Sequence, residues 1–261
     1  MQSLSIAATG MMAQQLNVEV ISNNIANMST SGFKAQRAEF QDLLYQNLRR
    51  VGTNSSDSGT IVPSGVQIGL GVKTGSVYRI MTQGDLNNTG NKLDVAIQGR
   101  GYFRVQMPSG TDAYTRAGNF SLSPTGQIVT SDGYTVAPGI TVPPTASDIT
   151  ISNDGQVQAT IPGQTAPQIV GQLELSTFPN EGGLDPQGNN LFLETSASGA
   201  PTTGNPASIG FGTLQQGFLE TSNVNAVTEI SDLITAQRAY EMNAKVITAS
   251  DEMMSTTSNL K

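Results

Sequence analysis

The chain has 261 residues and a net charge of −7, and it contains no cysteine, histidine or tryptophan. Without cysteine or histidine it cannot form a typical zinc site, a cysteine nucleophile or a Ser-His-Asp triad. Its hydrophobic content of 37% and charged content of 13% both lie below those of average globular proteins. These values argue against a compact metabolic enzyme and favour turn-rich β structure, with no disulfide.

Basic residues are too scattered for a nucleic-acid-binding surface. The longest basic run is Arg49-Arg50, so binding of nucleic acid is set aside. No stretch approaches the roughly 20 consecutive apolar residues of a membrane span. No lysine or arginine precedes Lys34, so we expect that any export proceeds without a cleaved signal peptide.

Residues 4–28 are predicted to form one long amphipathic helix. Ser3 is a candidate N-cap, and Gly32 is a candidate C-terminal turn residue. Apolar residues recur at every seventh position, which is typical of a coiled-coil seam, and Gln14 interrupts the neighbouring row. The main seam row is Leu4, Met11, Val18 and Ile25, and the neighbouring row is Ala7, Gln14, Ile21 and Met28.

The segment after this helix has two predicted parts. Phe40, Leu43, Leu44 and Leu48 have the spacing of one face of a short helix. Residues 52–71 are rich in Ser, Thr, Asn and Gly and include Pro63, so they are predicted to be a loop or an extended arm. A flexible surface loop is the alternative interpretation.

Residues 93–211 are predicted to form an antiparallel β domain of many short strands. Short β-branched or aromatic runs alternate with turn signals such as Asp132-Gly133 and Asp154-Gly155, which indicate hairpin turns before they indicate catalytic carboxylates. The longest strand candidate is 168–178. Three shorter candidates are 102–105, 126–129 and 149–151.

Residues 224–260 are predicted to form a second long helix with the clearest pattern in the chain. Ser222, Asn223 and Asn225 are candidate caps. The seam rows are Leu233, Tyr240, Ile247 and Met254, and beside them Ile230, Gln237 and Ala244. Because the two helices flank a large β insert, they must lie near each other to bury their apolar faces.

The heptad rows allow two interpretations. One is a helical hairpin buried within a monomer. The other is a coiled coil or helical array, which long, capped helices of this kind favour. A chain organised in this way is more often a subunit of a tubular assembly than an enzyme.

Two further motifs are too weak to indicate a ligand site. Residues 69–75 contain glycines, but their spacing does not match that of a nucleotide-binding loop and no helix is predicted to follow. Residues 85–90 resemble the start of a calcium loop without its downstream glutamate, so a turn is the preferred interpretation. No metal or other cofactor is therefore expected.

Several sequence runs together resemble the axial proteins of the bacterial flagellar rod and hook. At the N-terminus these are residues 22–27 (SNNIAN) and 32–34 (GFK), and at the C-terminus 222–225 (SNVN) and 236–241 (AQRAYE). In the middle they are residues 93–103 (LDVAIQGRGYF) and 114–120 (YTRAGNF). The resemblance covers essentially the whole chain, with looser matches at 81–84 and 152–159.

Within that family, residues 45–72 and 190–201 are most similar to the group that forms the distal rod. The resemblance implies a mixed α and β fold in which the terminal helices form a coiled coil, with a central antiparallel β domain and an extended arm. It implies helical domains at 1–30 and 223–261, a connecting domain at 31–92 and 212–222 with the arm at about 46–71, and a β domain at 93–211. The function implied is that of a structural subunit, not an enzyme.

The implied assembly is a hollow, rigid helical homopolymer that transmits motor torque across the periplasm. The implied partners are further copies of the chain, proximal rod proteins below, the hook protein above, the periplasmic and outer-membrane ring proteins, and the flagellar type III export apparatus. The implied location is the basal body.

The resemblance also implies roles for individual residues. The assembly seam would be Leu4, Met11, Val18, Ile25, Ile230, Leu233, Tyr240, Ile247 and Met254. Polar residues fixing the register would be Asn23, Asn24, Asn27 and Gln237, and residues of the rigidifying arm would be Gly52, Ser55, Ser56, Pro63, Gly65 and Gly69.

Two alternatives remain. One is a proximal rod or hook subunit of the same family. The other is a secreted β-rich protein that binds or cleaves cell-wall glycan, which would need paired carboxylates in a cleft and exposed aromatic platforms. The aromatic content of 5% and the absence of tryptophan disfavour the second alternative.

Overall fold

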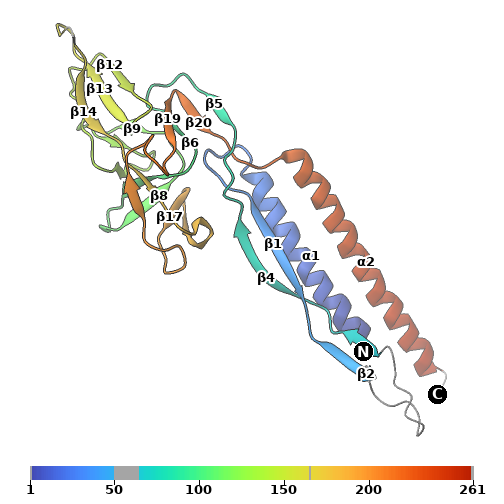
Figure 1. Ribbon diagram of the computed structural model, residues 1–261. Coiled ribbons are helices and arrows are strands. Elements are labelled where there is room, and N and C mark those ends of the chain that lie inside the picture. Colours follow the sequence, from blue (N-terminus) through green and yellow to red (C-terminus); the bar gives the residue numbers. More distant parts are fainter. Residues whose placement is uncertain (1, 50–64, 165, 260–261) are drawn as a thin grey trace. The chain divides into compact units, whose positions relative to one another are not determined.

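The computed structural model describes residues 2–49, 65–164 and 166–259. The chain divides into two compact units, each described here by itself (Figure 1). The helical unit consists of Met1–Ile25, Gln36–Tyr78 and Ala226–Lys261. The β unit consists of Ala26–Ala35 and Arg79–Asn225.

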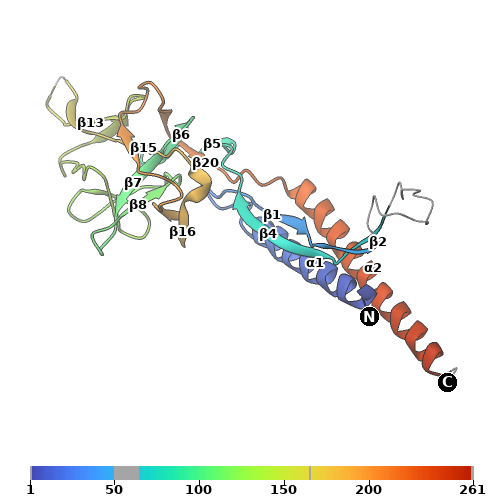
Figure 2. The ribbon, with the colours of Figure 1, turned by 60° about the horizontal axis from the view of Figure 1, so that its bottom comes forward.

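The helical unit contains the two predicted terminal helices, α1 (Gln2–Ala26) and α2 (Ala226–Asn259). Both predictions of a long helix are confirmed. Two strand pairs accompany them: β1 (Gln36–Asp42) with β4 (Val72–Arg79), and β2 (Tyr45–Arg49) with β3 (Val66–Gly69). Figures 1 and 2 both show β1 and β4 running beside α1.

The predicted short helix around Phe40 and Leu48 is wrong, because these residues lie in strands β1 and β2. The pairing partners β4 and β3 come from residues 66–79, so a nonlocal contact overrides the local helical spacing. The predicted loop at 52–71 is also corrected at its end, where Val66–Gly69 forms a strand antiparallel to β2. The glycine-rich segment at 69–75 leads into strand β4, in agreement with our rejection of a nucleotide-binding loop.

The β unit is antiparallel, and its described strands form four sheets. A nine-stranded sheet has the order β16-β17-β8-β7-β11-β10-β9, with β15 joining β7 to β18. A three-stranded sheet has the order β12-β13-β14, and β19-β6 and β20-β5 form pairs. The prediction of a central antiparallel β region is confirmed.

The elements of the β unit have the following bounds. They are β5 (Leu86–Asn88), β6 (Val95–Gln98), β7 (Tyr102–Gln106), β8 (Asp112–Thr115), β9 (Ser121–Leu122), β10 (Ile128–Val129), β11 (Thr135–Val136), β12 (Asp148–Ile151), β13 (Gln156–Thr160), β14 (Gln168–Gln172), β15 (Leu175–Thr177), the 3-10 helix η1 (Glu181–Gly183), β16 (Asp185–Gly188), β17 (Leu191–Leu193), β18 (Thr202–Gly204), β19 (Thr213–Gln216) and β20 (Phe218–Glu220).

Buried apolar residues from several strands form the core of the β unit. The larger cluster includes Val95, Phe103, Ile128, Val157 and Leu175. A second cluster is aromatic and comprises Tyr102, Tyr114, Phe178, Leu184 and Phe192, with edge-to-face ring contacts. Burial of these side chains stabilises the β unit through the hydrophobic effect.

The predicted Asp-Gly turns are confirmed. The amide of Gly133 donates to the carbonyl of Thr130 at 2.9 Å, and that of Gly155 donates to the carbonyl of Ser152 at 2.9 Å. Both glycines have positive φ, +83° and +87°, which favours glycine at these positions. The predicted strand at 168–178 is divided instead, since β14 pairs with β13 whereas β15 pairs with β7 and β18.

Candidate functional site

The two helices of the helical unit meet along a row of small and polar residues. Asn24 donates to both carboxylate oxygens of Glu229 at 3.3 Å, and Ser250 donates to the hydroxyl oxygen of Ser3 at 3.3 Å. A Cβ atom at Gly10 would lie only 2.9 Å from Nδ2 of Asn243. These three contacts run in opposite directions along the two chains, so α1 and α2 are antiparallel.

Successive contact residues are separated by seven and then fourteen positions in both helices. The same spacing aligns Asn17 with Ala236, which is buried. We call these eight positions the polar row: Ser3, Gly10, Asn17 and Asn24 of α1, and Glu229, Ala236, Asn243 and Ser250 of α2. A heptad row of polar residues favours one alignment of two helices over shifted alignments, because a shift would leave polar groups without partners.

Asn24 is the best-connected residue of this row and is buried. Its side-chain oxygen accepts from the amide of Gln36 at 2.8 Å, and its side-chain nitrogen donates to the carbonyl of Gln36 at 2.8 Å. The same nitrogen reaches Glu229 on α2. Asn24 therefore joins α1, the start of β1 and α2.

The other residues expected to fix the register lie elsewhere. Asn23 is exposed, and Asn27 accepts a hydrogen bond from the hydroxyl of Thr30 at 3.1 Å within the β unit. Gln237 is exposed on α2 beside a groove described below. Of the four, Asn24 lies in the polar row between the helices.

The residues expected to form the seam flank the polar row and are not its centre. Of the nine, Ile230, Tyr240 and Met254 are exposed, and the other six are half-buried: Leu4, Met11, Val18, Ile25, Leu233 and Ile247. Sequence reasoning identified Asn24 but missed the rest of the polar row, because the predicted seam followed apolar residues. The signal that could have identified it is the seven-residue recurrence of Ser, Gly and Asn in the first helix.

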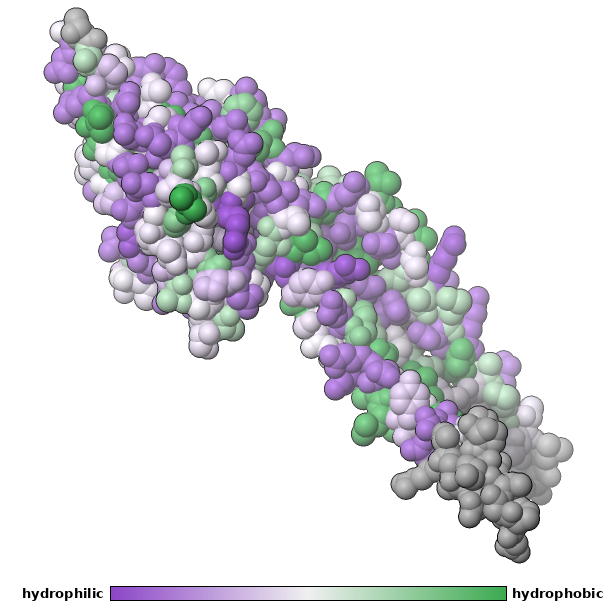
Figure 3. All heavy atoms as spheres, viewed as in Figure 1, coloured by the Kyte–Doolittle hydropathy of each residue, from purple (hydrophilic) through white to green (hydrophobic). Residues whose placement is uncertain are grey.

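Large apolar side chains remain exposed on the helices. Figure 3 shows hydrophobic residues in patches over the visible face of this unit. Contiguous exposed apolar surface marks a site of interaction with another macromolecule. The exposed residues are Met12 on α1, and Val227, Ile230, Ile234, Tyr240, Met242, Val246, Met253 and Met254 on α2.

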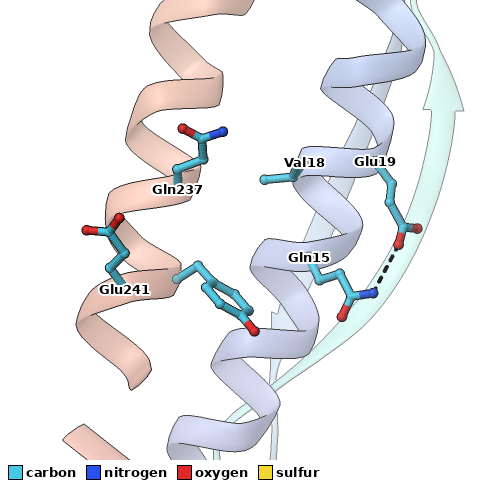
Figure 4. A pocket seen from close by; sticks show the side chains of 6 residues that line it. Gln15, Val18, Glu19, Gln237 and Glu241 are labelled. Carbon is cyan, nitrogen blue, oxygen red and sulfur yellow. Dashed lines mark hydrogen bonds between the residues drawn. The ribbon is translucent and has the colours of Figure 1, made fainter. Parts of the chain in front are cut away.

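A groove of about 480 Å³ lies between the helices on one side of the polar row. Figure 4 shows Val18 projecting from α1 toward α2, with Gln237 on α2, whereas Glu19 and Glu241 lie on the outer sides of the two helices. Gln15 donates to the carboxylate of Glu19 at 3.2 Å, and Tyr240 completes the lining. The groove is therefore apolar inside and acidic at its edges.

A substitution at Gly10 tests whether the two helices approach each other closely. Valine at this position will lower the free energy of unfolding of the helix pair by about 1–3 kcal/mol, because its branched side chain collides with Asn243. Thermal unfolding followed by helical circular dichroism measures the change. The matched control is the double change Gly10→Ala with Asn243→Ala, which removes the collision; equal loss in both variants would contradict the close approach.

Glu229 makes the helix pair sensitive to pH. Its partial burial raises the pKa of its carboxyl, the hydrogen bond from Asn24 lowers it, and the nearby Asp232 raises it, with a net increase. A raised pKa in the folded state means that folding favours the protonated acid. The contribution to stability is thus complete below the ordinary glutamate pKa of about 4.3 and is lost as pH rises through the folded value.

We expect Glu229→Gln to remove this part of the pH dependence, because the amide oxygen still accepts from Asn24 without carrying charge. Unfolding temperatures of the helical signal, compared from acidic to neutral pH, measure the effect. The matched control Glu252→Gln changes an exposed glutamate of the same helix and should keep the wild-type profile. A Glu229→Gln profile that follows the wild type would contradict the assignment.

A fully buried group of three charges lies in the β unit. Glu220 accepts from Nζ of Lys34 at 2.5 Å and from Nε of Arg116 at 2.9 Å. It also accepts from the amide of Gly84 at 3.0 Å. We call Lys34, Arg116 and Glu220 the charge cluster.

The remaining donors of the charge cluster also have partners. Lys34 donates to the carbonyl of Thr82 at 2.8 Å, and Arg116 donates to the carbonyls of Gly99 and Gly101 at 2.9 and 2.7 Å. Burial lowers the pKa of Lys34, an effect that Glu220 opposes. The cluster therefore depends on Glu220 to compensate two buried cations.

The charge cluster joins the segments through which the chain enters and leaves the β unit. Lys34 follows the first helix in sequence, Glu220 ends β20, and Arg116 follows β8. Nearby, the side chain of Asn223 accepts from the amide of Ala35 at 2.7 Å and donates to the carbonyl of Ile80 at 2.9 Å. Lys34 and Arg116 lie in sequence runs that carry the family resemblance, Glu220 lies just before another, and none of the three was assigned a role from the sequence.

The residues expected in the rigidifying arm are only partly described. Gly65 precedes β3, and Gly69 pairs with Tyr45 on β2. Gly52, Ser55, Ser56 and Pro63 lie outside the described residues.

The described part of the chain holds no cluster of three or more acidic side chains able to bind a metal ion. None of its helices is both long and apolar enough for a membrane span.

Three parts of the chain match families of flagellar proteins. Residues 4–34 match the flagella basal body rod protein family, and residues 215–260 match the C-terminal family of the flagellar basal body rod FlgEFG proteins. Residues 96–159 match the D1 domain of the flagellar hook protein FlgE/F/G family. The matched segments include both helices and much of the β unit.

The chain is also similar over its full length to flagellar basal-body rod proteins FlgG. It is 63% identical to that of Caulobacter vibrioides over 261 residues, with 100% of each chain covered. It is 55% identical to that of Agrobacterium fabrum over 262 residues, again with 100% of each covered. Identity to the Bacillus subtilis protein is 40% over 268 residues, covering 100% of this chain and 99% of the relative.

Proposed function

The chain belongs to the family of flagellar basal-body rod proteins, and from this premise we propose that it is a structural subunit of the flagellar distal rod. The observation that carries the proposal is the full-length similarity to basal-body rod proteins, at 63% identity with the Caulobacter relative. The function is mechanical rather than catalytic.

In this proposal, copies of the chain polymerise helically into a hollow, rigid driveshaft that carries motor torque across the periplasm to the hook. The terminal helices of neighbouring copies pack as a coiled coil around the channel. The exposed apolar side chains of α2, such as Val227, Ile234 and Met242, support this arrangement. Each would lose contact with water when a neighbouring helix covers it.

In this proposal the polar row and the exposed apolar faces have different roles in assembly. Polar contacts such as Asn24 with Glu229 set the alignment of the two helices within one copy. The apolar faces then provide the attraction between copies. The arm at about 46–71 would brace neighbouring subunits, and the β2–β3 pair supplies an ordered base for it.

The proposed partners follow from the place of a distal rod segment. They are proximal rod proteins below, the hook protein above, the surrounding periplasmic and outer-membrane ring proteins, and the flagellar type III export apparatus. The proposed location is the basal body, reached by export without a cleaved signal peptide.

Cryo-electron tomography of the parent bacterium with this gene deleted tests the function. We expect a rod truncated inside the periplasm, without hook or filament. A complete rod that lacks only the hook would indicate a hook subunit, and a rod missing its proximal part would indicate a proximal rod subunit. Intact flagella would contradict membership of the rod and favour a secreted β-rich protein.

A further inference from the structure

The groove between α1 and α2 has a chemical character that selects its occupant. Val18 is half-buried inside it, and Tyr240 is 44% exposed. The exposed carboxylates Glu19 and Glu241 lie on its opposite sides (Figure 4). Among the described residues neither carboxylate forms an ion pair. An occupant that combines apolar side chains with cations would complement this groove.

Helix α2 itself carries such a combination on the face that adjoins the groove, where Glu241 lies three residues from Arg238 and four from Lys245. Helix α1 has no lysine or arginine, and the only cations of α2 are Arg238 and Lys245. Both are exposed, and in the described part of the chain neither has a carboxylate partner. They lie seven residues apart, about two helical turns, and so project from the same face.

Two exposed apolar residues share this face. Ile234 is 46% exposed and Met242 is 60% exposed, and each lies four residues from Arg238. Residues four apart are neighbours on a helix surface. We call Ile234, Arg238, Met242 and Lys245 the basic stripe.

We propose that the groove of one copy receives the basic stripe of a second copy of this chain. Glu19 and Glu241 then face cations of the second copy's α2, while Ile234 and Met242 of that helix cover Val18 and Tyr240. The inference rests on the proposed function, because repeated copies of α2 are available only in a polymer. It extends that function by specifying the two surfaces, groove and basic stripe, through which neighbouring subunits contact each other.

The contact joins two different surfaces of the same chain and is therefore heterologous. A heterologous contact that does not close into a ring continues from copy to copy and produces a helical filament. The geometry thus supplies both attraction and direction of growth.

Cysteine cross-linking between two co-expressed chains tests the contact directly, because the natural sequence has no cysteine. One chain carries Glu19→Cys and the other Arg238→Cys, both in the deletion strain, and isolated basal bodies are treated with a bis-maleimide whose span matches that of a Glu–Arg ion pair, because cysteines at these two positions are too far apart for a direct disulfide. We expect a cross-linked dimer only when both variants are present. The matched control pairs Glu19→Cys with Asp232→Cys, an exposed position roughly a third of a turn around α2 from Arg238.

Absence of the Glu19–Arg238 dimer in rods that contain both variants would overturn the groove contact and leave the rod function standing. An equally strong dimer with Asp232→Cys would also overturn it. A chain that is missing from rods altogether would overturn both proposals.

Charge exchange provides a second readout that does not depend on cross-linking. Glu19→Arg and Arg238→Glu are each expected to cause loss of swarming, and their combination in one gene is expected to recover it. Because Glu19 is on α1, rescue cannot come from neighbours within α2. Single variants that swarm normally, or a double variant no better than the worse single one, would contradict the proposal.

Discussion

Replacing Glu220 with glutamine will lower the free energy of unfolding of the β unit by about 3–5 kcal/mol. Glu220 is the only anion of the charge cluster, and its side chain is completely buried between Lys34 and Arg116. Glutamine keeps the size of the side chain but leaves two buried cations without a compensating charge. Removing one member of a buried ionic group destabilises a protein strongly, because a charge is left buried without a partner. Replacing the whole group by apolar residues often changes stability much less.

Chemical denaturation of the full-length protein, followed by a signal from the β unit, measures this change. The matched control is Asp148→Asn, which removes an exposed ion pair with Lys92 at 2.6 Å and should change stability little. If Glu220→Gln and Asp148→Asn have equally small effects, the cluster does not have the structural role assigned to it.

Tyr240→Asp or Ile247→Asp is expected to abolish rod assembly and motility while the β unit remains folded. Both positions flank the polar row on α2, where Tyr240 is exposed and Ile247 is half-buried. When a neighbouring copy covers this face, a new carboxylate must lose water without a partner, at a cost of several kcal/mol per copy. Repetition of that cost at every subunit prevents growth of the polymer.

Swarming assays and electron microscopy of isolated basal bodies measure assembly, and circular dichroism of the purified variant checks the β unit. Tyr240→Phe and Ile247→Leu are the matched controls, since they keep the apolar surface. Normal rods in the aspartate variants would contradict the assignment of this face to assembly.

The two long helices were predictable because their signals are local. The seven-residue recurrence of apolar residues and the flanking caps place them to within two residues of the structure's α1 and α2. The turns at Gly133 and Gly155 were predictable for the same reason, since an Asp-Gly pair specifies its own backbone conformation.

The segment that contains β1 and β2 could not be predicted locally. Phe40 and Leu44 have helical spacing, yet the chain there pairs with strands β3 and β4, which lie 17 or more residues further along the sequence. Strand preference depends on such partners more than on the residues themselves. The division between β14 and β15 has the same origin, because each strand joins a different sheet.

The charged and polar contacts escaped prediction for a different reason. Lys34, Arg116 and Glu220 are widely separated in sequence, and no periodicity indicates that they meet. The polar row was recognisable in the sequence as a seven-residue pattern. The prediction gave more weight to hydrophobic residues, however, and therefore placed the contact between the two helices on the neighbouring apolar rows. In this chain polar contacts align the two helices within one copy, whereas several large apolar side chains of α2 remain exposed.

Helical reconstruction of rods from the parent bacterium by cryo-electron microscopy tests the central claim most directly. We predict that this chain forms the distal segment, with α1 and α2 packed against those of neighbouring copies and the exposed side chains of Tyr240 and Met242, which lie on different faces of α2, both buried between subunits. A distal rod in which these side chains remain in contact with water, or which is built from another protein, would contradict it.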